Sequence, residues 1–322
     1  MKSKLLQIKR IVIFGGTGFI GKHIVRRLAA AGYLIRIFTR DQEKAACLKL
    51  CGNLGQISIL EGDFFNEKSI LESMEGCDVV INLVGILYEK RKYDFYTVHV
   101  GIAERIAKAA QIKNVSMMIH FSAMGIENDK LSKYAQSKLK GEKAVASAFQ
   151  GAMIIKPSLV FGKEDNFFNK FARLATILPF LPLIGSGITK FQPICVTNLA
   201  EVVYRIISFN KQDKKIYNIG GSKVYSFKSL LKFILNVTNR KCLLINVPFP
   251  MARLIAFFLE SKVVSVLLKP ITGDASPILT RDQVKVMMSS SIEKSDDLET
   301  MKIRPLAIEN VVPEYLKIYR KH

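Results

Sequence analysis

Short apolar runs alternate with amphipathic stretches along the first half of the chain. The apolar, β-branched runs are predicted strands, and they lie at 10–14, 34–39, 57–61, 78–83 and 116–121. Between them, stretches such as 21–31 and 97–111 place apolar side chains at the spacing of one helix face. Alternation of this kind predicts an α/β fold, with a doubly wound parallel sheet, right-handed crossovers and helices on both faces.

The pattern changes after Pro157. Residues 167–178 are predicted to be helical, a stretch rich in Pro and Gly follows at 179–187, and the chain beyond Val196 is mostly helical with one clear strand at 215–219. We therefore predict a sheet domain at 1–156, with return segments near 190–222. A smaller, mostly helical domain at 157–322 would cover the carboxyl edge of the sheet and bind a substrate or partner.

Composition and charge narrow the class of protein. The chain has 322 residues, 49% hydrophobic and 23% charged, a balance typical of globular proteins with a large core. The formal net charge of +21 predicts attraction to phosphates, acidic lipids and acidic proteins. Because the lysines are spread along the whole chain without a basic and aromatic cluster, we do not expect nucleic acid as a partner.

The cysteines do not indicate a metal site. There are five, an odd number, and none forms a CxxC pair. A zinc ion held by Cys47 and Cys51 would need two further ligands, and His23 is the only histidine near them in sequence. We expect reduced thiols in a cytosolic protein, with no metal.

Membrane-spanning and secretory segments are also not expected. The basic start of the chain surrounds only a short apolar stretch, which does not resemble a signal peptide. The longest apolar stretch, 247–268, carries Arg253, Glu260 and Lys262, so we predict an amphipathic or buried helix there and not a transmembrane one.

Residues 15–21 read GGTGFIG and lie directly between a predicted strand and a predicted helix. Gly15 permits the tight turn, Gly18 lets the backbone approach a pyrophosphate, and Gly21 lets the helix pack closely on the sheet. The helix N-terminus then offers free N–H groups and partial positive charge to that anion. The turn predicts a Rossmann-type dinucleotide site, whose binding residues here are Gly15, Thr17, Gly18, Phe19, Ile20 and Gly21.

The end of the second strand bears on the choice between NAD and NADP. Dinucleotide-binding domains that use NAD place an acidic side chain there, whereas this chain has Arg40. A guanidinium suits a 2′-phosphate through bidentate hydrogen bonds, so we predict NADPH over NAD. Asp41 is one residue further and would reach a ribose hydroxyl, and a solvated Arg40 without a ligand is the alternative.

Two other strand ends supply candidate contacts. Gly62-Asp63 ends the third strand, where an adenine edge would lie, and Asn82 to Gly85 follow the fourth strand beside the ribose and nicotinamide. The predicted cofactor-binding residues outside the glycine turn are Arg40, Asp63, Phe64, Leu83, Val84, Gly85, Tyr134, Lys138 and Pro157.

Tyr134 and Lys138 are four residues apart in the segment YAQSK, so they would share one face of a helix. An ammonium near the phenol would lower its pKa and favour the phenolate needed for proton transfer. The same lysine would donate to the nicotinamide ribose. We predict this pair as the catalytic residues.

Together, GGTGFIG, Gly62-Asp63, Asn82 to Gly85 and the Tyr134/Lys138 pair resemble the extended short-chain dehydrogenase/reductase superfamily. In that superfamily a serine or threonine after the fifth strand completes the catalytic set. Ser122 matches the first serine of the usual pair, and we include it as a third catalytic candidate although its register directs it elsewhere. Ala123 stands at the position that normally carries the hydroxyl, so the ordinary reaction of the superfamily is not implied.

The second half resembles one atypical branch of this superfamily. Residues 156–172, KPSLVFGKEDNFFNKFA, are similar to its RPSxVFGxEDxFFNxFA signature, and 189–196 and 277–284 match its later motifs. Asn198 departs from the aspartate that many members carry. The branch contains the nucleotide-binding accessory subunit nine of the alpha subcomplex of NADH:ubiquinone oxidoreductase (complex I) and its bacterial relatives.

This resemblance implies a bound NADPH that is structural or sensory, in a protein lying peripherally at a membrane arm with complex I subunits as partners. The location would be cytoplasmic, at the inner face of the membrane, the equivalent of the mitochondrial matrix. The stretch 247–268 and the positive surface would contact anionic lipid, although an ordinary helical core with solvated lysines explains them equally. The alternatives are an active NADP-dependent reductase or epimerase on a quinone-related, lipid or nucleotide-sugar substrate, and a nucleic-acid-binding regulator that rests on charge alone.

Overall fold

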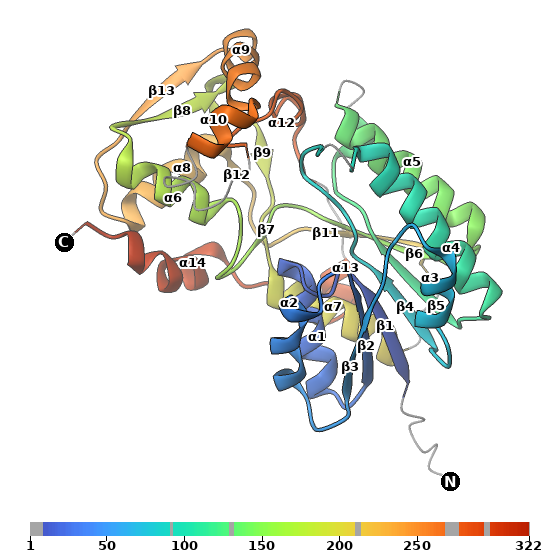
Figure 1. Ribbon diagram of the computed structural model, residues 1–322. Helices are drawn as coiled ribbons and strands as arrows, with labels where there is room; N and C mark the ends of the chain where they lie inside the picture. The colour runs from blue at the N-terminus through green and yellow to red at the C-terminus, as the bar shows by residue number, and fades with distance from the viewer. Residues whose placement is uncertain are drawn as a thin grey trace.

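The computed structural model describes residues 9–90, 93–128, 132–209, 214–267, 277–292 and 297–321. Its centre is a seven-stranded sheet in the order β11-β6-β5-β4-β1-β2-β3, with every pairing parallel (Figure 1). The strands are β1 (Arg10–Phe14), β2 (Leu34–Thr39), β3 (Ile57–Glu61), β4 (Val79–Asn82), β5 (Met117–Phe121), β6 (Met153–Pro157) and β11 (Ile216–Ile219). The predicted doubly wound parallel sheet is confirmed.

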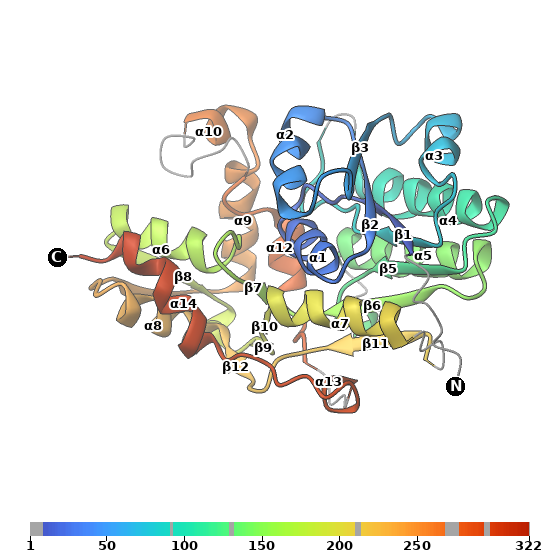
Figure 2. The same cartoon turned by 90° about the horizontal axis from the view of Figure 1, so that it is seen from below.

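Helices cover both faces of this sheet because its central strands, such as β4 and β5, are buried on both sides. Successive side chains of a strand point to opposite faces. Ile11 and Ile13 therefore belong to the core cluster that contains Leu28, while Val12 and Phe14 belong to another. Figure 2 shows the two helical layers on either side of the strands. One contains α1 (Phe19–Ala30) and α7 (Val196–Phe209), and the other α3 (Glu67–Ser73), α4 (Ala103–Ile112) and α5 (Lys133–Ala148).

The chain returns to the sheet domain after visiting the second part. α7 packs on α1, and β11 then adds to the sheet edge, with Ile216 opposite Ile154 of β6. The short helix α13 (Asp297–Thr300) packs against β11, and Leu298 joins the same buried cluster as α1 and α7. Segments that are far apart in the sequence, α7, β11 and α13, thus complete one side and one edge of the seven-stranded sheet.

The second part has a separate core, formed by helices and three strand pairs. The helices are α6 (Phe168–Ile177), α8 (Phe227–Val237), α9 (Phe249–Leu259), α10 (Lys262–Leu267), α12 (Arg281–Val286) and α14 (Ile308–Leu316). The pairs are β7 (Val160–Phe161) with β10 (Ile194–Cys195), β9 (Lys190–Phe191) with β12 (Tyr225–Ser226), and β8 (Phe180–Ile184) with β13 (Leu243–Val247). The strand predicted at 215–219 is confirmed as β11, but the prediction of only one clear strand beyond Val196 was wrong, because β12 and β13 also lie there.

The prediction of a single helix over 247–268 is also wrong. Val247 ends β13, and Pro248 then precedes the first residue of α9 in an extended conformation, which ends the strand and starts the helix. The helix stops at Leu259, and α10 begins at Lys262. Leu268, the last residue of the predicted stretch, lies outside the described residues.

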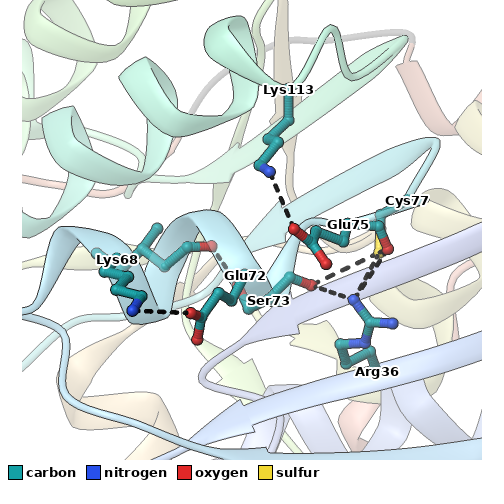
Figure 3. Close-up of polar contacts among 8 residues, drawn as sticks. Arg36, Lys68, Glu72, Ser73, Glu75, Cys77 and Lys113 are labelled. Carbon is teal, nitrogen blue, oxygen red and sulfur yellow. Dashed lines mark hydrogen bonds and ion pairs between the residues drawn. The ribbon is translucent and has the colours of Figure 1, made fainter.

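A half-buried arginine joins β2 to the end of α3 (Figure 3). Arg36 Nη1 donates to the carbonyl oxygens of Ser73 at 2.8 Å and Glu75 at 3.0 Å. The first carbonyl belongs to the last residue of α3 and the second lies just beyond the helix, where no intrahelical donor remains, so the guanidinium satisfies both. The Glu75 side chain in turn accepts from Lys113 Nζ at 3.3 Å, just past the end of α4. Arg36 therefore fixes one helical layer to the sheet.

Candidate nucleotide-binding and reaction site

The glycine turn between β1 and α1 has the close contacts that its sequence predicts. Gly15 has a φ of +82°, which disfavours any side chain there. Gly18 N donates to Gly15 O at 3.1 Å and closes the turn. A Cβ on Gly21 would lie 2.7 Å from Gly16 Cα and would also collide with Gly15 O. The helix can therefore approach the turn only because residue 21 is glycine.

This turn lies where the order of the strands reverses, between β1 and β4. A Cβ on Gly15 would lie 3.0 Å from the carbonyl carbon of Leu83, so the turn touches the chain that leaves β4. Leu83 N donates to Phe14 O at 2.9 Å, and Val84 N donates to Asn82 Oδ1 at 3.0 Å. In open α/β sheets the crevice at this reversal is the ligand site.

The N-terminus of α1 opens into this crevice. Gly18, the N-cap residue of α1, has no side chain to cap the helix, and the first turn of α1 contains no acidic residue. Its first N–H groups and the positive end of its dipole are thus available to an anion. Phe19 packs beside Gly162, whose Cβ would lie 3.4 Å from the Phe19 ring, and Lys22 pairs with Glu164 at 2.7 Å. The second-half motif therefore supports the start of α1.

Asp165 explains part of that motif. Its carboxylate accepts from Phe168 N at 2.6 Å and from Gly162 N at 3.2 Å, and it also accepts from Tyr315 Oη at 2.5 Å. Burial raises the pKa of Asp165, while these hydrogen bonds act to lower it. The motif thus joins the start of α6 to α14 and has a structural role in this chain.

Aromatic rings and Arg40 form the end of the site beyond β2 and β3. The exposed guanidinium of Arg40 lies 4.6 Å from the centre of the Tyr93 ring and 5.6 Å from that of Phe64. Phe64 is only 6% exposed and packs on Phe38 with ring centres 5.2 Å apart, so it forms a wall. Asp41 is engaged as the N-cap of the short helix α2 (Gln42–Ala46). Of these two charges, Asp41 is therefore used within the protein, whereas the exposed Arg40 guanidinium lies over the Tyr93 ring.

Asp63 and Tyr93 complete that end. Asp63 is exposed and accepts from Phe65 N at 3.0 Å. Sequence reasoning missed Tyr93, because it lies in a loop without periodicity and reaches Arg40 only through the fold.

At the other end of the crevice, Lys138 reaches the turn after β4. Its Nζ donates to Phe121 O at 3.1 Å, and a Cβ on Gly85 would lie 3.2 Å from the same nitrogen. Burial lowers the pKa of Lys138 to about 8, and the nearby Glu142 carboxylate acts in the opposite direction. The structure therefore brings together Lys138, Gly85 and the end of β5.

Tyr134 shares a helix face with Lys138 on α5 but has a different environment. Its ring stands edge-on to His99, with centres 5.4 Å apart, and to Phe95 at 5.7 Å. Burial raises the pKa of Tyr134 to about 12. The expected lowering of this pKa by Lys138 is wrong for this structure, because the ammonium donates to the Phe121 carbonyl while the phenol is buried beside the rings of Phe95 and His99.

His99 is a residue of this site that sequence reasoning missed. Its Nε2 accepts from Ile86 N at 3.1 Å, so the proton is on Nδ1, which donates to Ser137 Oγ at 2.8 Å. Burial, and secondly the Lys138 ammonium, lower the pKa of His99 to about 2. It belongs to a π-helical stretch, Thr97–Ile102, where the ordinary helix was expected. Such stretches occur often at functional sites.

The hydroxyl of Ser122 is directed away from the reaction site into a buried polar network. It donates to Glu142 Oε1 at 2.5 Å, and Glu142 Oε2 lies 2.9 Å from Lys156 Nζ. Lys156 also pairs with Glu127, and Ser122, Glu142 and Lys156 are all buried. Ala123, the next residue, offers only a methyl group. Ser122 is therefore already used as a donor inside the protein.

The last predicted contact, Pro157, ends β6. It is buried, and its carbonyl oxygen accepts from Met124 N at 3.0 Å, so it lies beside the loop that follows β5. Among the described residues, no group of three or more His, Cys, Asp or Glu side chains is arranged to hold a metal ion. Within the same residues, no helix combines the length and apolar content required to span a bilayer.

The parallel sheet, the glycine turn at the strand reversal and the Tyr134–Lys138 pair define a dinucleotide-binding protein of the short-chain dehydrogenase/reductase type. Residues 11–220 match the NAD dependent epimerase/dehydratase family, and the chain belongs to that family. It is 32% identical to the mouse (Mus musculus) mitochondrial NADH dehydrogenase (ubiquinone) 1 alpha subcomplex subunit 9, over 96% of this chain and 80% of that protein. It is 30% identical to the Arabidopsis thaliana protein of the same name, over 96% of this chain and 77% of that one.

Solved structures agree on the fold. A triphenylmethane reductase from Citrobacter sp. superposes with a TM-score of 0.76 and 18% identity, over 96% of this chain and 99% of the other. At that identity the likeness concerns the fold alone. The resemblance to the subunit nine branch is thus supported over nearly the whole chain by the sequence relatives.

Proposed function

We propose that this protein binds NADPH in the crevice between β1 and β4 and holds it without turnover, as an accessory component of respiratory complex I. One observation carries the proposal. The pyrophosphate end of the site is open at the N-terminus of α1, whereas at the reaction end Ser122 is bound to Glu142 and Ala123 has no donor. A site that keeps its binding residues, with Ser122 already bonded and only a methyl group at Ala123, suits retention of a cofactor more than reduction of a carbonyl.

The preference for NADPH rests on Arg40. Its exposed guanidinium, placed over the Tyr93 ring, would form bidentate hydrogen bonds with a 2′-phosphate. Fluorescence titration with NADPH and NADH measures the preference. We expect Arg40→Asp to reverse it and Lys68→Asp, the same charge change on the exposed face of α3, to leave it unchanged. An unaltered ratio in Arg40→Asp would refute this role for Arg40.

The absence of turnover is tested on the protein loaded with NADPH. It is offered menadione, a simple aldehyde and a UDP-sugar, and the absorbance at the nicotinamide band is followed. We expect oxidation no faster than in buffer, with the cofactor still bound after gel filtration. Oxidation that disappears in Tyr134→Phe would contradict the proposal and support an enzyme.

Association with complex I is proposed from the relatives, which carry the name of its subunit nine. In α9 the residues packed in the core are small, Ala252 and Ala256, whereas Leu254, Phe257 and Phe258 are 60%, 54% and 60% exposed. Large apolar side chains on the outside of a helix mark an interaction surface. With a net charge of +21, we propose that this face of α9 contacts an anionic membrane surface.

Flotation with vesicles tests this contact. We expect binding to vesicles with cardiolipin that is stronger than to vesicles of phosphatidylcholine alone, and loss of binding in Phe258→Asp. Ile112→Asp changes a residue that is 66% exposed on α4 and serves as the matched control. Equal flotation of both variants would refute a role for α9. In that case we propose that the protein lies on the cytoplasmic side of the membrane, or on the equivalent matrix side, without a contact between α9 and lipid.

A second candidate is an active NADP-dependent reductase or epimerase on a quinone-related, lipid or nucleotide-sugar substrate. The retained Tyr134–Lys138 pair favours it, because Lys138 Nζ lies beside the Gly85 turn, where it would donate to the nicotinamide ribose. The turnover assay with Tyr134→Phe separates the two candidates.

A further inference from the structure

Residues 280–292, here called the strap, connect the second part to the carboxyl edge of the sheet. They contain α12, which begins at Thr280 with a reciprocal capping box to Gln283. Figure 1 shows α12 between α9 and the N-terminal end of α5, and contacts exist on both sides. Val284 is fully buried in the core of the second part, so the strap is anchored there.

Asp282 joins the strap to the helix that carries Tyr134. One carboxylate oxygen accepts from Lys133 N at 2.8 Å, and the other accepts from Ser132 Oγ at 2.8 Å and from Tyr134 N at 3.0 Å. α5 has no acidic residue in its own first turn. The charge at its N-terminus is therefore supplied from 150 residues further along the chain. Such hydrogen bonds are charge-assisted and also favour the helix dipole.

The rest of the strap contacts the chain after three successive strands of the sheet. Gln283 Nε2 donates to Leu87 O at 3.4 Å, after β4. Ser291 Oγ donates to Met124 O at 3.2 Å, after β5. Ser158, after β6, donates to the carbonyl oxygen of Ser291 at 2.8 Å.

The approach to the loop after β5 is close. Gly125 has a φ of +82°, and a Cβ there would lie 2.8 Å from Ser290 O. The strap thus contacts the sheet edge at which His99, packed against the Tyr134 ring, accepts from Ile86 N in the turn after β4. The strap therefore lies across the side from which a substrate would approach.

We propose that the strap is a cover over the reaction end of the nucleotide site and that Asp282 is its latch. Closed, the cover holds the nicotinamide end of the cofactor and excludes a second, reducible substrate; released, it lets both exchange with solvent. This inference rests on the proposed binding of NADPH. Asp282 acts through the backbone of α5 and is a positioning residue, not a catalytic one.

The test compares Asp282→Asn, Asp282→Glu and a control, Ser226→Ala, which removes the hydroxyl cap of α8 in the second part. Stopped-flow displacement of NADPH gives the dissociation and association rates. Nitration of Tyr134 by tetranitromethane, read by mass spectrometry without cofactor, reports exposure of the reaction end. We expect Asp282→Asn to raise the dissociation rate about tenfold, the loss of one charge-assisted contact of about 1.4 kcal/mol. Nitration of Tyr134 should rise in parallel.

Asp282→Glu should restore part of both effects because its carboxylate can reach the same N–H groups, and Ser226→Ala should leave both at the wild-type values. Unchanged nitration and dissociation in Asp282→Asn would overturn the latch. If exchange of backbone amide hydrogens shows the strap released while nitration stays low, the strap is not a cover. If the wild type binds no NADPH, the proposed function fails, and nitration alone still decides the inference.

Discussion

Two buried histidines should make the folded protein sensitive to mild acid. His99 and His120 are 2% and 1% exposed. Burial, and secondly the Lys138 ammonium, lower the pKa of His99 to about 2 and that of His120 to about 3. His120 is held neutral by geometry as well, since its Nδ1 lies 3.1 Å from the amide nitrogen of Asn82 and accepts from it. Folding therefore favours the neutral form of both imidazoles, in which each ring carries one N–H proton and not two.

The sign of the effect follows from the two pKa values of each group. An unfolded histidine has a pKa of about 6.5, so below that pH the unfolded state binds protons that the folded state does not. The free energy of unfolding must then fall as the pH drops through 6.5, and it continues to fall toward the folded pKa values. With about 1.4 kcal/mol per proton and pH unit, each histidine removes about 2 kcal/mol between pH 7 and pH 5. Together they remove about 4 kcal/mol, a large part of a typical stability.

Urea unfolding at pH 7, 6 and 5 measures this dependence above the range in which carboxylates titrate. We expect His99→Gln and His120→Gln each to reduce the pH slope of the wild type by about half, whatever they do to stability at pH 7. Thr238→Ala, which removes a buried hydroxyl bonded to Ile234 O at 2.8 Å in α8, should lower stability with the slope intact. If His120→Gln keeps the wild-type slope, the imidazole is protonated in the folded state and the reasoning is wrong.

Two further predictions concern the turn and the sheet. Gly21→Ala should abolish NADPH binding in a fluorescence titration, because its Cβ would lie 2.7 Å from the Gly16 backbone, whereas Gly101→Ala, with nothing within 4 Å, should leave affinity unchanged. Arg36→Met should lower the free energy of unfolding by about 2 kcal/mol in urea, since two carbonyls lose their donor. Lys68→Met should change it by less than about 0.5 kcal/mol, since that ion pair is exposed and 3.9 Å long. Equal losses in Arg36→Met and Lys68→Met would contradict the second.

The parts of the fold that the sequence predicted well are those fixed by local pattern. β1, β2 and β3 agree with the predicted strands to the residue, because each is an apolar run bounded by turn residues. β8 was missed because it lies in a stretch rich in Pro and Gly, and β13 was missed because it has no buried alternating face. Leu243 and Ile245 of β13 are 73% and 45% exposed, and the strand exists through pairing with β8, some sixty residues earlier.

In the candidate site, too, the features set by neighbouring residues were predictable from the sequence, and those set by distant contacts were not. The glycine turn depends on contacts within seven residues, and its sequence was sufficient to predict its geometry. Spacing placed Tyr134 and Lys138 on one helix face, but it could not show that the ammonium donates to the Phe121 carbonyl or that burial raises the pKa of the tyrosine. Asp282 was inaccessible to any local argument, because its contact with α5 spans the whole second part.

The N-termini of α1 and α5 both lie at the carboxyl edge of the sheet, and they differ in whether their N–H groups have partners within the protein. α1 begins at Gly18 without a side-chain cap, so its positive end is left for a pyrophosphate. α5 begins at Ser132 with its N–H groups already bound to Ser132 and Asp282, so its positive end is satisfied from within. An uncapped N-terminus such as that of α1 suits a protein that holds a nucleotide. The contact of Asp282 with α5, in contrast, is not required for a substrate to reach Tyr134. Since the same strap that carries Asp282 also contacts the chain after β4, β5 and β6, the proposed retention of the cofactor and the proposed exclusion of a substrate would both depend on one set of contacts.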